Sequence, residues 1–142
     1  MTDVKYMYTN TEMNASGEGR EYRWIPTVEE ESCHGSREIN LRTKHFGNRK
    51  LFLIGEVTSQ MANDFTSQML YLSQNDEPVD IYINSPGGSV NAGLVIYDII
   101  QACKEKMEIN MYCIGMAASM GAVLLAGGQK GHRYILPHSK VM

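Results

Sequence analysis

Residues 109–126 read INMYCIGMAASMGAVLLA, and this stretch joins two different patterns. The apolar run at 109–114 predicts a buried strand, and residues 119–126 predict a helix that begins at Ser119. Small residues flank this serine on both sides, so a substrate carbonyl could approach it, and a helix N-terminus could stabilise negative charge there. An ordinary helix cap would also explain a serine at this position without any chemistry.

Strand and helix patterns alternate on both sides of this stretch. Further strands are predicted at 50–54, 79–84 and 133–136, and further helices at 59–73, with Thr58 as N-cap, and at 91–106, mostly buried. This alternation favours an α/β domain with a largely parallel sheet. Because ligands bind at the carboxyl ends of parallel strands, the loops at 85–89 and 115–119 should lie at the same edge of the sheet.

The loop Ser85-Pro86-Gly87-Gly88-Ser89 is the second place that could carry chemistry. Adjacent glycines permit positive φ and a close approach of a ligand to the main chain, where free N–H groups can bind an anion. A plain turn with Ser89 as a helix cap is the alternative interpretation. If the loop is functional, Ser119 would be a nucleophile and the N–H groups of Gly88 and Met120 would form its oxyanion hole.

A nucleophilic serine needs a base, and the four histidines offer no obvious one. His34 and His45 lie in the irregular N-terminal part, and His132 lies in a charged turn that predicts a solvated side chain. His138 follows the last predicted strand and could lie near the edge of the site.

Bulk properties exclude several classes of protein. A net charge of −3 does not support nucleic-acid binding. Three scattered cysteines suggest neither a zinc site nor a disulfide framework and are typical of reduced thiols in the cytoplasm. No apolar run approaches the ~20 residues that a membrane span needs. Residues 1–48 are polar and are predicted to be a partly disordered segment ahead of a domain at 49–142.

Two motifs, YINSPGGSV at 82–90 and IGMAASMGA at 114–122, with LPHSKVM at 136–142 after them, resemble the proteolytic subunit of the ATP-dependent Clp protease family. The resemblance covers about residues 50–142, and residues 25–29 are similar to the family's axial N-terminal segment. It implies the Clp protease/crotonase-like α/β fold of repeated strand-strand-helix units. Ser119 matches the family's nucleophile, and Gly88 and Met120 match its oxyanion-hole positions.

The resemblance also implies an activity and partners. The family's serine endopeptidase cleaves unfolded proteins that an AAA+ unfoldase delivers, and the unfoldase hydrolyses the ATP. Heptameric rings stack into a tetradecamer in the cytoplasm, and no metal or organic cofactor is expected in the proteolytic subunit.

This sequence departs from the family pattern at its C-terminus. In the family, Val-Met is followed by Ile and the catalytic His, which would be position 144, and the catalytic Asp comes later. The chain is therefore expected to be a truncated form that lacks both groups and is a poor peptidase alone, and His138 stands where many relatives carry Asn. Two alternatives stay open, an inactive paralogue that modulates mixed rings and a crotonase-like acyl-CoA enzyme that would not need Ser119. A Ser/Lys hydrolase of the signal-peptide-peptidase type is disfavoured because no lysine is well placed.

Overall fold

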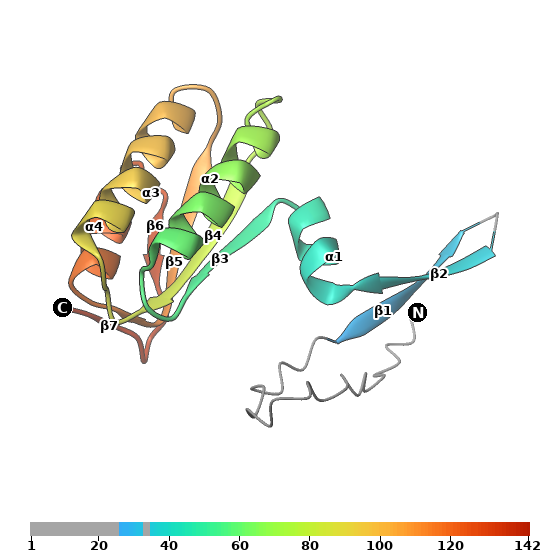
Figure 1. Ribbon diagram of the computed structural model, residues 1–142, viewed down its shortest axis with the longest axis horizontal. Coiled ribbons are helices and arrows are strands. Elements are labelled where there is room, and N and C mark those ends of the chain that lie inside the picture. The colour runs from blue at the N-terminus through green and yellow to red at the C-terminus, as the bar shows by residue number, and fades with distance from the viewer. Residues whose placement is uncertain (1–25, 33–34) are drawn as a thin grey trace, which may run out of the picture. The chain divides into compact units, whose positions relative to one another are not determined.

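The computed structural model describes residues 26–32 and 35–142, which belong to two compact units divided in the sequence between Asn48 and Arg49 (Figure 1). The larger unit contains a five-stranded sheet with the order β3-β4-β5-β6, and β7 pairs with β5 beyond the end of β6. Every pairing in this sheet is parallel, which confirms the predicted α/β class. The strands are β3 (Lys50–Ile54), β4 (Val79–Ser85), β5 (Ile109–Ala117), β6 (Arg133–Ile135) and β7 (Lys140–Val141).

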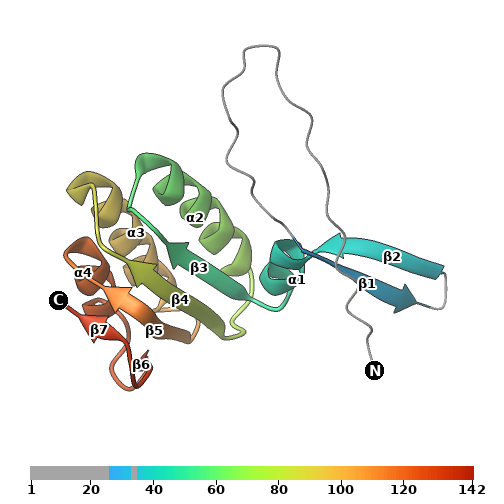
Figure 2. The same cartoon turned by 90° about the horizontal axis from the view of Figure 1, so that it is seen from below.

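Three helices cover one face of this sheet (Figure 2). They are α2 (Ser59–Leu72), α3 (Val90–Cys103) and α4 (Met120–Ala126). Alternate strand residues point toward the helices because successive side chains of a strand lie on opposite faces. The resulting core contains, among others, Leu51, Leu53, Phe65, Met69, Ile81, Ile83, Ile96, Ile100, Met111 and Leu124.

The chain after β3, β4 and β5 turns directly into α2, α3 and α4. The expected strand-strand-helix repeat takes the form here of one strand, a short loop and a helix. The loops after β3 and β4 are joined by an isolated parallel bridge between Val57 and Gly88. The predicted caps are present, since the Thr58 hydroxyl accepts from the Met61 N–H at 3.2 Å and the Ser89 hydroxyl from the Ala92 N–H at 3.3 Å.

The prediction that α3 is mostly buried is wrong for one of its faces. Leu94 and Val95 are each 46% exposed, whereas Ile96 and Ile100 are fully buried. Within the described residues only the side of α3 that faces the sheet and its neighbouring helices is covered. Hydrophobic residues on most sides of a helix therefore did not indicate burial of all those sides here.

The sheet face opposite the helices carries a ladder of stacked rings. Phe52, Tyr82, Tyr112 and Tyr134 occupy matching register positions on four neighbouring strands. Their ring centroids are 5.4, 5.0 and 4.9 Å apart, within the range of offset stacking. The pairing register aligns these rings, because each of the four strands has one aromatic residue at the position directly opposite that of its neighbour.

The smaller unit contains more regular structure than predicted. β1 (Thr27–Ser32) pairs antiparallel with β2 (Gly35–Asn40), and α1 (Leu41–Gly47) follows with Asn40 as its N-cap. The prediction of an irregular chain is therefore wrong for these elements, while residues 1–25 and His34 lie outside the described residues. An ion pair between Lys44 and Glu30 ties α1 to the hairpin.

Candidate active site

The last part of β5 bulges away from β4 just before Ser119. Ile83 pairs with Cys113 but Ser85 pairs with Ala117, so three residues of β5 lie opposite a single residue of β4, Asn84. Gly115 lies in this bulge with φ +93°, and a Cβ there would come within 2.9 Å of the Asn84 Oδ1 atom. Bulges redirect the residues that follow them, and this one sets the direction in which the chain reaches the serine.

Ser119 connects β5 to α4 in a conformation that residues with a side chain rarely adopt. Its φ is +49° and its ψ is −121°, and its side chain is exposed. It stands at the N-cap position, yet its hydroxyl makes no capping hydrogen bond. A strained serine at a sharp strand-to-helix turn is the geometry of a nucleophile elbow, although Ala117 stands where that motif has its first glycine. The geometry therefore does not support the interpretation of Ser119 as an ordinary cap.

Backbone hydrogen bonds on two sides hold this turn. The Ser119 N–H donates to the Met142 carbonyl at 3.0 Å, and the Met142 N–H donates to the Ala117 carbonyl at 3.0 Å. On the other side, the Ala118 N–H donates to the carbonyl of Ser85 at 3.0 Å. These contacts restrain the backbone while the Ser119 hydroxyl stays at the surface.

The glycine loop after β4 packs directly against Ser119, which confirms that the two loops share one edge of the sheet. Gly87 has φ +97°, and a Cβ there would lie 2.7 Å from the Ser119 Cβ and 3.0 Å from the Met120 nitrogen. Only a residue without a side chain permits this approach.

The two N–H groups predicted to form an oxyanion hole are both free to bind a ligand. Val57 holds the loop on either side of Gly88, since its N–H donates to the Gly87 carbonyl and its carbonyl accepts from the Ser89 N–H, both at 2.9 Å. Among the described residues, neither the Gly88 N–H nor the Met120 N–H donates to an acceptor. Their role as oxyanion donors stays a prediction.

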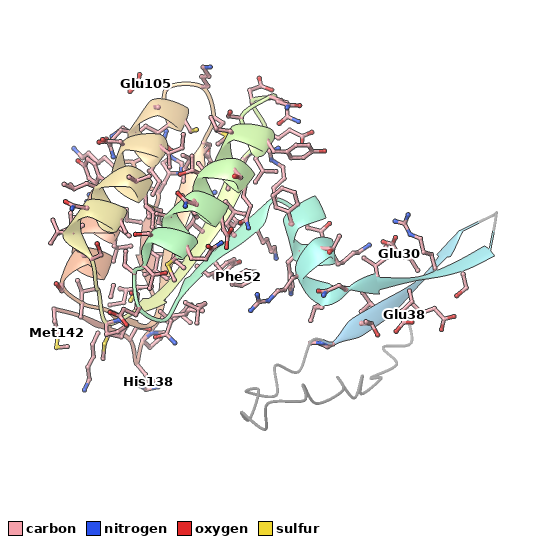
Figure 3. The ribbon with its side chains drawn as sticks, viewed as in Figure 1. Glu30, Glu38, Phe52, Glu105, His138 and Met142 are labelled. Atoms are coloured by element: carbon pink, nitrogen blue, oxygen red, sulfur yellow. The ribbon has the colours of Figure 1, made fainter. Side chains whose placement is uncertain are left out.

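None of the described histidines contacts Ser119 by a hydrogen bond. His132 is half-buried rather than solvated, because its Nδ1 atom lies 3.0 Å from the Asn110 Oδ1 and 3.6 Å from the Glu108 Oε1. Asn110 is the second residue of β5 and Ala117 is its last, so at about 3.3 Å per residue His132 lies some 20 Å from the serine. His138 and Met142 lie at the same end of the larger unit (Figure 3). His138 lies in the turn that joins β6 to β7, outside the paired residues of either strand.

The two described cysteines do not offer an alternative nucleophile. Burial raises the pKa of the Cys103 thiol and of the Cys113 thiol, so both are protonated at neutral pH. In the part of the chain that the structure describes, no three His, Cys, Asp or Glu side chains cluster in a way that could hold a metal ion. Likewise, none of the described helices is long and apolar enough to cross a membrane.

Two contributors to the site were missed by sequence reasoning. Ser139 accepts a hydrogen bond from the Gly115 N–H at 2.7 Å, and the Met142 carbonyl holds the Ser119 N–H. Both belong to the segment around β7, a strand of two residues that shows no periodic pattern. The signals that pointed to this segment were the proline turn before Ser139 and the family resemblance of residues 136–142, and neither indicated these contacts.

Comparison with known families agrees with this geometry. A family model described as Clp protease matches residues 33–142. The matched residues include both loops, the bulge in β5 and every element of the larger unit.

Proposed function

The chain belongs to the Clp protease family, and we propose that it is a serine-type endopeptidase subunit whose nucleophile is Ser119. The observation that carries this proposal is the strained, uncapped conformation of Ser119 at the turn between β5 and α4. Strain of this kind costs on the order of 1–3 kcal/mol and persists where surrounding contacts enforce it, which is characteristic of functional sites.

In the proposed reaction, the Ser119 Oγ attacks the carbonyl carbon of a peptide bond while its proton passes to a general base. The C–N bond then breaks, the amine leaves with that proton, and water hydrolyses the acyl-serine ester. The oxygen of the tetrahedral intermediate accepts hydrogen bonds from the N–H groups of Gly88 and Met120. Within the described part of the chain neither N–H group donates a hydrogen bond, and both flank the contact between Gly87 and Ser119. One such donor typically contributes about 10²–10³ in kcat.

We assign the general base to a histidine that the family pattern places two positions after Met142. The hydrogen bond from the Ser119 N–H to the Met142 carbonyl supports this assignment. His132 lies too far from the serine for this role, and His138 makes no hydrogen bond to Ser119.

Members of the Clp protease family form oligomeric rings, and the assembly proposed for this chain is two stacked heptameric rings. An AAA+ unfoldase would deliver unfolded proteins and hydrolyse ATP, and the peptidase itself would need no cofactor. The exposed apolar side chains of Leu94 and Val95 on α3 support burial of this surface in an assembly.

A crotonase-like acyl-CoA enzyme is the competing activity, because it would use the same N–H donors. Such an enzyme has no use for a nucleophilic side chain at the elbow. An alanine or glycine at position 119 would serve it equally well, and the strained serine therefore favours the peptidase.

The test compares peptidase activity of the protein expressed from its complete reading frame with that of its Ser119→Ala variant. A fluorogenic peptide is the substrate, and Ser67→Ala is the control, since the Ser67 hydroxyl donates to the Asn63 carbonyl on the exposed side of α2. Loss of the nucleophile should lower kcat to background, by up to about 10⁶-fold, and the control should match the parent protein. Full activity in Ser119→Ala would refute the proposal, and thioester turnover in that variant would favour the competing activity.

A further inference from the structure

We propose that Ser139 is a positioning residue for Ser119, because its hydroxyl closes a gap between β6 and β7 and so secures the backbone that holds the nucleophile. This inference rests on the proposed function, since it assigns Ser139 a role in keeping Ser119 reactive.

The gap lies along the edge of β5 that faces β6 and β7. β6 pairs with β5 as far as Cys113, and β7 pairs with it only from Met116 onward. Gly115 lies between these two pairings, so neither β6 nor β7 provides a backbone acceptor for the Gly115 N–H. The Ser139 Oγ accepts from this N–H at 2.7 Å and takes the place of a strand carbonyl.

The residue after Ser139 has a further contact with β5. The sulfur of the buried Cys113 lies 3.7 Å from the Lys140 carbonyl. Residues 139 and 140 thus contact both the last paired residue before the bulge and the glycine within it, at the point where β7 begins.

The connection from Ser139 to the nucleophile is short. β7 begins directly after Ser139, and the Met142 that follows β7 supplies the carbonyl that accepts from the Ser119 N–H. The hydrogen bond between Ser139 and Gly115 therefore holds the start of β7 against β5. Without that anchor, β7 should separate from β5 more often, and each separation would release the Ser119 N–H.

The test compares two variants of equal shape, Ser139→Thr, which keeps a hydroxyl, and Ser139→Val, which does not. Ser67→Ala is again the matched control, because it removes one hydroxyl hydrogen bond far from the site. Amide hydrogen exchange at Gly115 and Ser119 is measured in the complete protein, together with kcat and KM for a fluorogenic peptide. Loss of a single hydrogen bond should raise exchange at both amides by about five- to tenfold in Ser139→Val.

The expected result is faster exchange and a lower kcat in Ser139→Val at nearly unchanged KM, with Ser139→Thr and Ser67→Ala close to the parent protein. Equal exchange at Ser119 in the valine and threonine variants would overturn the inference. The exchange measurement needs no catalysis, so it still decides the role of Ser139 in holding the Ser119 backbone if Ser119→Ala proves fully active. Full activity in Ser119→Ala would refute the proposed nucleophile, whatever the exchange measurement shows.

Discussion

Replacing Ser119 with glycine should stabilise the larger unit while it removes the nucleophile. Ser119 has φ +49° and ψ −121°, which costs a residue with a Cβ on the order of 1–3 kcal/mol and costs glycine little. Glycine loses about 0.5–1 kcal/mol more than other residues through its greater freedom in the unfolded chain. No capping hydrogen bond is lost, so the net gain should be about 1 kcal/mol, or roughly 4–8 °C in Tm for a unit of this size.

Two alanine variants make the comparison specific. Ser119→Ala keeps the Cβ and the strain, so its Tm should stay close to that of the parent protein. Ser89→Ala removes a true cap, whose hydroxyl accepts from the Ala92 N–H, and should cost about 1 kcal/mol. Thermal unfolding followed by circular dichroism, with all three variants in the same buffer, measures these differences.

The opposite result would be that Ser119 behaves as the capping residue Ser89 does. A capping serine would lose about 1 kcal/mol on replacement by alanine and a few tenths on replacement by glycine. A Ser119→Ala variant destabilised as much as Ser89→Ala, together with no gain in Ser119→Gly, would show that the turn is not strained and that the serine is structural.

Three further predictions concern the loop, the frame of the sheet and the thiols. Gly87→Ala should lower the peptidase kcat by about 10²-fold or more, because the new Cβ would lie 2.7 Å from the Ser119 Cβ. Steady-state kinetics measures kcat, and an unchanged value would contradict the close packing of Gly87 against Ser119. Arg49→Lys should destabilise the larger unit by about 1–3 kcal/mol, because the Arg49 guanidinium donates to the carbonyls of Leu72, Glu77 and Pro78 and a lysine ammonium cannot reproduce this set of hydrogen bonds. Urea unfolding measures this difference, and an unchanged midpoint would contradict the prediction. Burial raises the pKa of Cys103 and Cys113, so as pH rises above the ordinary value of 9.0 the thiols of the unfolded chain ionise first and the free energy of unfolding should fall. Urea titrations from pH 8 to 10.5 should show a shallower fall when either cysteine is replaced by alanine. An identical slope in the variants would contradict this pH dependence.

Most elements of the larger unit could be predicted because their patterns have a clear period. The alternating strand at 79–84 and the helix that begins after Thr58 are examples, and both agree with the structure to within one residue. The hairpin at 27–40 was missed because its strands are polar on both faces. Strand β7 was missed because two residues cannot show a period.

The candidate site could be predicted in part. Parallel strands end at one edge of a sheet, so the approach of the two loops followed from their order in the sequence. The strain at Ser119 could not be predicted, because a serine among small residues fits a cap and an elbow equally well. The contribution of Ser139 could not be predicted either, since its partner is the backbone N–H of Gly115, far away in the sequence.

The most direct test of Ser119 as a nucleophile is the site at which a fluorophosphonate reacts with the protein expressed from its complete reading frame. Tryptic peptides analysed by mass spectrometry should carry a single adduct on Ser119, and Ser119→Ala should carry none, while Ser67→Ala reacts at the parent rate. An adduct on another residue that persists in Ser119→Ala, or an unmodified Ser119 in a protein that hydrolyses peptides, would contradict the account.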